Sequence, residues 1–221
     1  MFKTKMLFCG LVLTMVLALS TADAVTVVNG DWEANADLGK VNCTTTADWS
    51  VIDGWTADGY GTNGASGQES NASHPDGFYC YSSGDGGSIF QTLSETISVG
   101  STYVLTYDAF NTWYGGAIIG ELYYVDDLGA RVGIVSDTVA FSLANDDVYV
   151  VTPGTAGFTA LAGEDYLGKP LGVQFSHDAS PHAPRNPWQC WAGFDNVAVV
   201  PEPATLMLLG LGGLGLIRRR K

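Results

Sequence analysis

The stretch that decides the fold is Thr102-Tyr103-Val104-Leu105-Thr106-Tyr107-Asp108-Ala109-Phe110. Within it, Tyr103, Leu105, Tyr107 and Ala109 occupy every second position, and the residues between them are mostly polar. Successive side chains of a β-strand point to opposite faces, so a period of two places the two sets on different faces. This stretch therefore predicts a strand that buries one face and exposes the other.

Similar short runs, rich in β-branched and aromatic residues, recur along the chain between clusters of Gly, Asn, Asp and Pro. We expect strands at 25–28, 54–57, 77–81, 88–93, 102–110, 117–125, 132–139, 147–151, 171–176 and 192–199. Residues 126–129 indicate a hairpin turn, whereas 61–67 and 82–87 are too rich in Gly and Ser for a strand. Because no run has the period of a long amphipathic helix, the sequence predicts an all-β sandwich over 25–199.

The charge of this central region limits its partners. Residues 25–199 contain four Lys and Arg residues against 21 Asp and Glu residues, a formal net charge of −17. Such a surface repels nucleic acid and anionic lipid headgroups. It suits an exported protein that neutralises part of its charge with divalent cations, although solubility alone explains the charge equally well.

The amino-terminal 24 residues have the features of a secretory signal peptide. Lys3 and Lys5 precede an apolar segment from residue 6 to residue 19, and Ala22-Asp23-Ala24 supplies small residues for cleavage. We expect cleavage after Ala24. The alternative is a first transmembrane helix, which the short apolar segment and the small residues disfavour.

The carboxyl-terminal segment, 200–221, has three parts. Val200-Pro201-Glu202-Pro203 is followed by an apolar run from residue 204 to residue 217 and then by Arg218-Arg219-Arg220-Lys221. Proline interrupts strand ladders and helix interiors, so the first part is expected to separate the tail from the domain. As a helix the apolar run would be about 21 Å long, which is short for a full bilayer span.

In this order, the three parts resemble the PEP-CTERM sorting signal of Gram-negative bacteria. The resemblance implies that the apolar helix anchors the protein transiently in the inner membrane, with the basic cluster on the cytoplasmic side. It also implies an exosortase as partner, which removes the tail near the Pro-Glu-Pro motif. The expected final location is the cell surface or the extracellular medium.

Four fragments of the central region resemble jelly-roll modules of the galactose-binding and carbohydrate-binding type. These fragments are Asn29-Gly30-Asp31-Trp32-Glu33, Gly54-Trp55, Gly100-Ser101-Thr102-Tyr103-Val104-Leu105 and Phe194-Asp195-Asn196-Val197. They occur in the family's order across nearly the whole region, so the resemblance implies a jelly-roll β-sandwich. The chain departs from the family by carrying Trp32 where Phe is usual and by a longer insert before Gly54.

The same resemblance implies a structural calcium ion that joins the opening segment to the closing strand. Its candidate ligands here are Asp31, Glu33 and Asp195, because calcium prefers oxygen ligands. In the alternative interpretation, Asp31 caps a turn and Asp195 accepts hydrogen bonds from backbone N–H groups. No other cofactor is expected.

Aromatic residues at two strand ends are the candidates for a carbohydrate site. Trp113 and Tyr114 follow the strand at 102–110, and Trp188 and Trp191 flank the start of the closing strand. If the two strands are antiparallel neighbours, these four residues share a rim on which the C–H face of a sugar could pack. Ordinary packing is the alternative for this group. The remaining tryptophans, Trp32, Trp49 and Trp55, are expected in the core.

Three cysteines remain after removal of the signal peptide. Cys80 lies in a strand-like run and is expected to be a buried thiol. Cys43 and Cys190 lie in polar or Pro-rich surroundings, and in an oxidising compartment we expect a disulfide between them. No Cys or His spacing of a zinc site is present.

No catalytic motif accompanies these features. His74, His177 and His182 lie outside any nucleophile motif, and His177 and His182 are expected in a solvated loop. The many carboxylates allow a glycosidase pair, but none is singled out. The expected function is that of a non-catalytic surface or extracellular-matrix protein with exopolysaccharide as its ligand. The alternatives are a structural matrix protein without a ligand site and an extracellular polysaccharide hydrolase.

Overall fold

The computed structural model describes residues 25–43, 46–58, 65–70, 77–84, 87–114, 116–141, 149–178 and 190–202. The expected signal peptide and the expected tail helix lie outside these ranges. Among the residues that the structure describes, no helix is long and apolar enough to cross a membrane.

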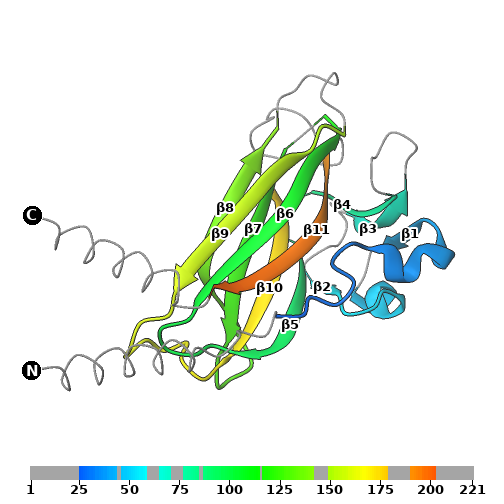
Figure 1. Cartoon of the computed structure of the whole chain (residues 1–221). Helices are drawn as coiled ribbons and strands as arrows, with labels where there is room; N and C mark the ends of the chain where they lie inside the picture. Colours follow the sequence, from blue (N-terminus) through cyan, green and yellow to red (C-terminus); the bar gives the residue numbers. More distant parts are fainter. Residues whose placement is uncertain are drawn as a thin grey trace, which may run out of the picture.

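The described residues form two antiparallel sheets that pack face to face as a jelly-roll sandwich (Figure 1). Sheet A has the strand order β1-β3-β4-β11-β6-β9, and sheet B has the order β2-β5-β10-β7-β8. The strands are β1 (Val41–Cys43), β2 (Thr56–Asp58), β3 (Ala65–Ser70), β4 (Phe78–Ser83), β5 (Ser88–Thr96), β6 (Thr102–Trp113), β7 (Ala117–Val125), β8 (Arg131–Ala140), β9 (Thr152–Thr159), β10 (Pro170–Asp178) and β11 (Trp191–Glu202). The predicted all-β jelly-roll fold is confirmed.

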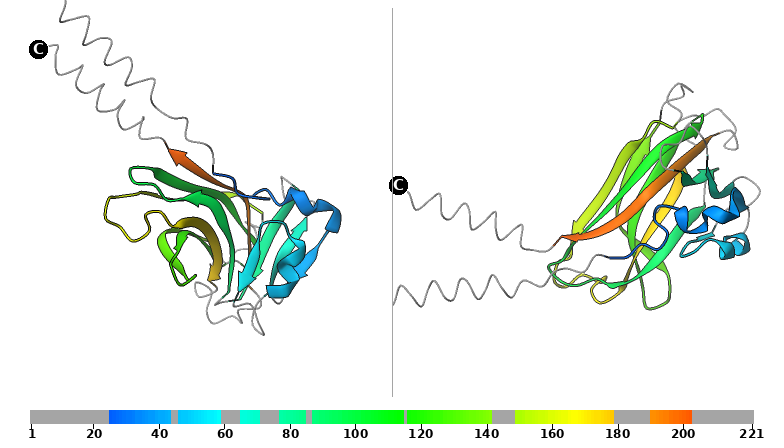
Figure 2. Two further views of the ribbon diagram at one scale, coloured as in Figure 1. Left: turned by 90° about the horizontal axis from the view of Figure 1, so that it is seen from below. Right: turned by 45° about the vertical axis from the view of Figure 1, so that its right-hand side comes forward.

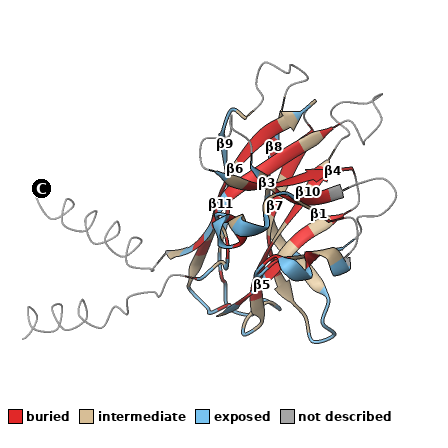
Figure 3. Ribbon diagram, turned by 90° about the vertical axis from the view of Figure 1, so that its right-hand side faces the viewer, coloured by how far each residue is buried: buried red, intermediate tan, exposed pale blue. Residues whose placement is uncertain are grey.

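Strand β6, which has the clearest sequence pattern, alternates in burial as predicted. Tyr103, Leu105, Tyr107 and Ala109 are buried between the sheets, whereas Thr106 is exposed on the other face. Strand β6 lies between β11 and β9 in sheet A, so one of its faces meets sheet B and the other forms the outside. Figure 3 shows buried residues along the strands of both sheets, with exposed residues toward the loops and short helices.

Aromatic rings fill the space between the sheets. Phe175 of β10 and Phe194 of β11 stack with ring centroids 4.0 Å apart. Trp32 stacks on Trp55 at 5.0 Å and meets Phe194 edge-on at 5.6 Å. Trp49 packs against Trp32 at 6.2 Å. The predicted core position of Trp32, Trp49 and Trp55 is confirmed, because each is 3% exposed or less.

Two short 3-10 helices, η1 (Glu33–Leu38) and η2 (Thr46–Val51), lie beside the sandwich next to β1 (Figure 2). Polar contacts connect this opening segment to the rest of the molecule. The Asn29 side chain donates to Asn35 Oδ1 at 3.1 Å, and the Asn29 carbonyl accepts from the Trp55 indole N–H at 3.1 Å. The first residues of the domain are therefore fixed against the start of β2.

Eight of the predicted strands overlap β2, β4, β5, β6, β7, β8, β10 and β11, but other local predictions were wrong. Residues 65–70 form β3 although 61–67 was predicted as a loop, because β1 and β4 pair with β3 on both sides. Strand β4 likewise continues to Ser83, into the predicted loop at 82–87. Strong pairing on both sides thus outweighs the low strand propensity of Gly and Ser.

The strand predicted at 147–151 is also wrong, since residues 149–151 precede β9 and 147–148 lie outside the described residues. Strand β9 lies at the edge of sheet A and consists mainly of Thr, Gly, Ala and Pro, so it lacks an apolar signal. At the amino terminus, Val25 makes only an isolated bridge with Val199 rather than the predicted strand at 25–28.

The Pro-Glu-Pro motif does not interrupt the domain where expected, because β11 continues through Pro201 to Glu202. Residues 200–202 pair with residues 104–102 of β6. Strand β4 pairs with β11 only over residues 191–194, so within the described residues the end of β11 has one neighbouring strand. Proline, which lacks an N–H group, is tolerated at such strand ends and edges. Pro203 and the basic cluster at 218–221 lie outside the described residues.

The prediction of a disulfide between Cys43 and Cys190 is wrong. In the structure both cysteines, and Cys80, are buried thiols. Strands β3 and β4 lie between β1, which carries Cys43, and β11, which Cys190 precedes. Three strand spacings amount to about 14 Å, whereas a disulfide joins Cα atoms no more than about 7 Å apart. Burial raises the pKa of the Cys43 thiol to about 12, so this thiol stays neutral. The predicted buried position of Cys80 is confirmed.

Candidate functional site

A second aromatic cluster lies on the outer face of sheet A, separate from the core. Tyr79, Tyr81 and Phe110 are buried there, and Tyr149 and Trp191 pack against them. The rings of Tyr79 and Phe110 meet edge-on at 5.0 Å, and those of Tyr81 and Trp191 are 5.5 Å apart. Because alternate residues of β4 and β6 point to opposite faces, the strands that bury the core also form this outer aromatic cluster.

Two glycines allow these rings to approach the backbone of the sheet. A Cβ atom at Gly193 would lie 2.4 Å from the Phe110 ring. At Gly67 it would lie 3.0 Å from the Tyr81 hydroxyl and 1.9 Å from the carbonyl oxygen of Val41. Glycine within a strand often marks such a close approach. A side chain at Gly193 would displace the Phe110 ring, and one at Gly67 would clash first with the backbone of β1.

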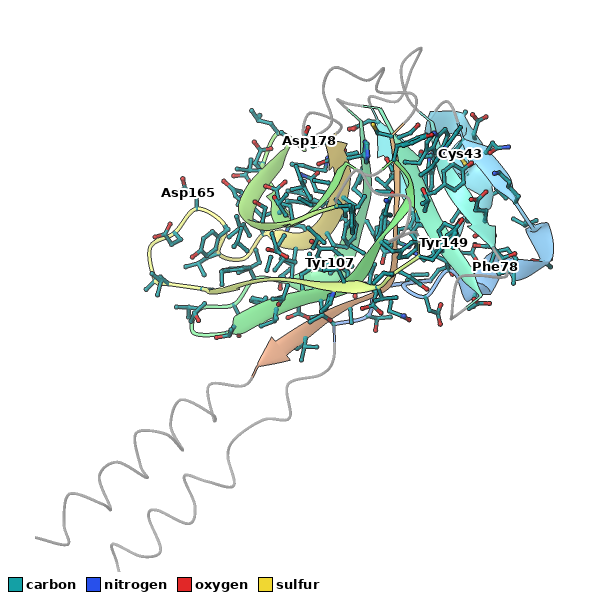
Figure 4. The ribbon with its side chains drawn as sticks, turned by 90° about the horizontal axis from the view of Figure 1, so that it is seen from above. Cys43, Phe78, Tyr107, Tyr149, Asp165 and Asp178 are labelled. Carbon is teal, nitrogen blue, oxygen red and sulfur yellow. The ribbon has the colours of Figure 1, made fainter. Side chains whose placement is uncertain are left out.

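Beside this cluster the surface forms a depression of about 340 Å³, which we call the aromatic depression. It is lined by Lys40, Glu69, Tyr81, Thr112, Trp113, Tyr149 and Trp191. Trp113 is 51% exposed, whereas Trp191 and Tyr149 are half-buried. Figure 4 shows Tyr149 near the start of β4, in agreement with the 5.9 Å between the ring centroids of Tyr79 and Tyr149.

The polar groups of the aromatic depression are fixed by one another. Glu69 accepts a hydrogen bond from the Tyr79 hydroxyl at 2.7 Å and forms an ion pair with Lys40. The Lys40 ammonium also lies 5.2 Å from the centroid of the Tyr81 ring. Burial raises the pKa of Tyr79, and its hydrogen bonds to Tyr149 and Glu69 raise it further, so the Tyr79 hydroxyl stays neutral. One carboxylate and one ammonium are thus held beside partly exposed aromatic rings.

Of the four aromatic residues that the sequence singled out, the structure brings Trp113 and Trp191 to the aromatic depression. Tyr114 lies beside them, with its ring 5.3 Å from that of Trp113 and its backbone bridged to Trp191. Strands β6 and β11 are antiparallel neighbours, as the predicted rim required. Trp188 lies outside the described residues.

Sequence reasoning missed the polar part of the depression. Glu69 lies on β3, in a stretch without strand pattern, and Lys40 precedes the three-residue strand β1. Tyr149 lies just before β9, where its backbone N–H donates to the Asn111 carbonyl at 2.8 Å. The positions of these residues depend on how distant strands pair, which no local pattern records.

The three carboxylates expected to bind calcium do not meet. Asp31 accepts a hydrogen bond from the Glu33 N–H at 3.3 Å, and Glu33 accepts one from the Phe78 N–H at 2.6 Å. Asp195 is buried and accepts one from the Asn196 N–H at 2.7 Å. Within the described ranges, no three His, Cys, Asp or Glu side chains gather as a metal site would require. Calcium at this place therefore stays a prediction.

His177 does not lie in a solvated loop, so that expectation is wrong. It lies on β10, is 3% exposed, and its Nδ1 atom is 3.3 Å from the Gly84 carbonyl oxygen. A Cβ atom at Gly116 would lie 2.3 Å from its Nε2 atom, so the ring is packed on both sides. His74 and His182 lie outside the described residues.

Several solved structures share this fold. The Stig cyclase Fisc from Fischerella sp. TAU, in complex with (3Z)-3-(1-methyl-2-pyrrolidinylidene)-3H-indole, has a TM-score of 0.61 and 20% identity over 83% of this chain and 99% of that chain. The enzymatically active domain of tailspike protein 4 of bacteriophage CBA120 has a TM-score of 0.53 and 13% identity over 81% of this chain and 22% of that chain. A CBM22-2 xylan-binding domain of Paenibacillus barcinonensis Xyn10C is less similar, with a TM-score of 0.47 and 14% identity over 68% of this chain and 93% of that chain. At these identities the first two similarities show the fold alone.

Two family models match the sequence itself. The model of the PEP-CTERM protein-sorting motif matches residues 199–221, where the sorting signal was expected. The model described as HpiC1 cyclase matches residues 23–200, which is most of the chain. Comparison with curated proteins returned no match. The chain therefore belongs to the HpiC1 cyclase-like family and carries a PEP-CTERM sorting motif at its carboxyl terminus.

Proposed function

We propose that this is an exported protein whose jelly-roll domain binds exopolysaccharide at the aromatic depression. The observation that carries the proposal is that Trp113, Trp191 and Tyr81 line one depression together with the Lys40–Glu69 ion pair. The PEP-CTERM motif supports delivery through the inner membrane and processing of the tail by an exosortase. The protein then acts at the cell surface or in the extracellular matrix.

The chemistry of the depression suits a sugar. The C–H face of a pyranose packs on an aromatic ring, and its hydroxyl groups need fixed donors and acceptors nearby. Trp113 offers a half-exposed ring, Glu69 offers an acceptor and Lys40 offers a donor. The volume of about 340 Å³ lies at the small end of the range for ligand sites, which suits a short stretch of a chain.

Charge favours a neutral polysaccharide over an acidic one. Residues 25–199 have a formal net charge of −17, and the positive charge of Lys40 is already paired with Glu69. Lys40 is the one cation among the described residues that line the depression. An anionic polymer would therefore approach against this field and meet a cation whose charge is already balanced.

An array of neutral and acidic glycans, probed with the processed protein, tests the proposal. We expect retention on neutral glycans, and titration with a retained oligosaccharide should change the tryptophan fluorescence. Substitution of Leu128, which is 93% exposed on the turn between β7 and β8, by Ala is the control and should not change binding. Absence of binding to every glycan would contradict the proposal.

A second candidate function is an enzyme that acts on a flat, apolar molecule. The family model is named for a cyclase, and a cyclase of this fold has been crystallised with an indole compound. Glu69 lines the depression beside aromatic rings and accepts a hydrogen bond from the buried Tyr79 hydroxyl, so a positioned carboxylate is available for proton transfer to such a substrate. Incubation with indole derivatives followed by mass spectrometry distinguishes the two functions. Turnover that Glu69→Gln abolishes would favour the enzyme.

A polysaccharide hydrolase and a purely structural protein receive less support. A glycosidase needs a pair of carboxylates across the scissile bond, and Glu69 is the one carboxylate among the described residues that line the depression. A purely structural protein would not need a half-exposed tryptophan beside a fixed ion pair.

A further inference from the structure

The sorting motif begins inside the folded domain. Strand β11 continues to Glu202, so the first three residues of the motif, 200–202, are paired with residues 104–102 of β6. The pairing occurs at the end of the sandwich where β6 begins and β11 ends (Figure 1). A processing enzyme that reads this motif therefore meets it as part of a sheet.

The β6 side of this pairing is firmly held. Tyr103 is 1% exposed, its ring stacks on that of Phe158 at 5.4 Å, and its hydroxyl accepts a hydrogen bond from the Ser98 N–H at 3.0 Å. The hydroxyls of Thr102 and Thr159 are 2.8 Å apart, so β9 supports the same end of β6. Movement of β6 away from the motif would disrupt the core.

On β11, the contacts with the opening segment of the domain extend to Val199. The Val197 N–H donates to the Gly30 carbonyl at 2.8 Å, and Val199 is buried and bridges to Val25. Beyond Val199, β6 is the one strand with which β11 pairs in the described part of the chain. Pro201 has no N–H group to donate. Residues 200–202 therefore lie past the last contact with the opening segment that the structure describes, and they are paired with β6 alone.

We propose that the exosortase acts on an opened form of the domain, in which residues 200–202 have separated from β6 while the strand up to Val199 stays in place. Peptide-binding proteins commonly take extended segments through backbone hydrogen bonds, and in the closed form β6 already occupies one edge of the motif. Where opening is fast relative to cleavage, the rate of processing follows the population of the open form. The pairing of β11 with β6 therefore slows the removal of the tail. This proposal does not depend on carbohydrate binding.

A pair of engineered disulfides tests the proposal in the full-length chain, incubated with membranes that contain the exosortase. V104C with V200C would lock the motif to β6, and T106C with A198C would lock the same two strands just before Val199. The two sites are two residues apart along both strands, so they have the same pairing geometry. All four side chains lie on the outer face and are exposed or half-buried.

We expect the oxidised V104C/V200C protein to be processed at less than a tenth of the wild-type rate, and reduction to restore processing. The oxidised T106C/A198C protein should be processed at the wild-type rate. Intact mass gives the processed fraction, and thiol labelling confirms each disulfide. Processing of oxidised V104C/V200C at the wild-type rate would overturn the proposal.

A second pair of variants leaves the motif unchanged. Val104→Gly removes the side chain opposite Val200, and Thr106→Gly removes the one opposite Ala198. Because a cross-strand pair stabilises a sheet modestly, we expect Val104→Gly to be processed about two- to fivefold faster than the wild type. Thr106→Gly should be processed at an unchanged rate. Equal rates for Val104→Gly and the wild type would contradict the proposal.

Discussion

Sheet A carries aromatic residues on both of its faces, and the rings differ in how far they are buried. On the inner face, Phe194 packs between Phe175 and Trp32, and none of the three is exposed. On the outer side, Trp191 and Trp113, the last residue of β6, remain partly exposed beside a charged pair. Strands β6 and β11 supply residues to both faces, because their side chains alternate. One pair of strands thus contributes to both the core and the candidate site.

The difference follows from how much apolar surface each ring removes from water. A fully buried ring contributes stability in proportion to its buried area, at roughly 25 cal/mol per Å². A half-exposed ring contributes less to folding, and its remaining exposed area is available to a ligand. Substitutions on the inner face should therefore change mainly stability, and those on the outer face should change mainly binding.

The largest effect is expected from Trp32→Ala on the inner side. Trp32 is fully buried and touches the rings of Trp49, Trp55 and Phe194, so its truncation leaves a cavity among them. We expect a loss of about 3–5 kcal/mol in the free energy of unfolding, measured by urea denaturation. A loss below about 1 kcal/mol would contradict the core position of this residue.

Trp191→Ala is expected to have an intermediate effect, because Trp191 takes part both in packing and in the candidate site. It is half-buried against Tyr81 and also lines the aromatic depression. We expect a loss of about 1–3 kcal/mol in the free energy of unfolding together with at least a thirtyfold rise in the dissociation constant for the glycan. Denaturation and titration of the same sample give both values. Unchanged glycan affinity would assign this residue to packing alone.

Trp113→Ala should separate the two effects most clearly. Its side chain is 51% exposed, so the free energy of unfolding should change by about 0.5 kcal/mol or less. As a stacking residue it should still cost about 2 kcal/mol in glycan binding, or about thirtyfold in the dissociation constant. A large drop in melting temperature without loss of binding would reverse the interpretation of the outer face.

The sequence predicted the inner face better than the outer one. Strand β6 and the core tryptophans follow from alternation and from the apolar character of large rings, which are local properties. Strand β7 has the predicted bounds, 117–125, for the same reason. Strands β3 and β9 were missed because Gly, Ser and Thr carry no apolar signal, and neighbouring strands decide their structure.

The candidate site was predicted in part for a related reason. Trp113 and Trp191 could be paired from the sequence because they lie at the meeting ends of two recognisable strands. Glu69 and Lys40 could not, since they reach the depression only through the pairing of β1, β3 and β4. The same limit affected the sorting motif, where Pro201 was expected to end the domain and instead pairs with β6.

A much smaller effect than that of Trp32→Ala is expected from Trp32→Phe, which tests how closely the inner face fits its residues. Phe is usual at this position in the jelly-roll modules that the opening segment resembles. The indole N–H of Trp32 is buried and has no hydrogen-bond partner among the described residues. An unsatisfied buried donor costs about 1–3 kcal/mol, and its removal would offset much of the packing lost with the smaller ring.

We therefore expect Trp32→Phe to change the free energy of unfolding by less than about 1.5 kcal/mol, the range of well-tolerated swaps between apolar residues. Trp49→Phe, at another buried tryptophan in contact with Trp32, is the matched comparison. Within the described ranges, the indole N–H of Trp49 is not an unsatisfied buried donor, so this substitution should cost more. If Trp32→Phe instead destabilises the protein more than Trp49→Phe does, shape rather than polarity determines which ring the inner face accepts.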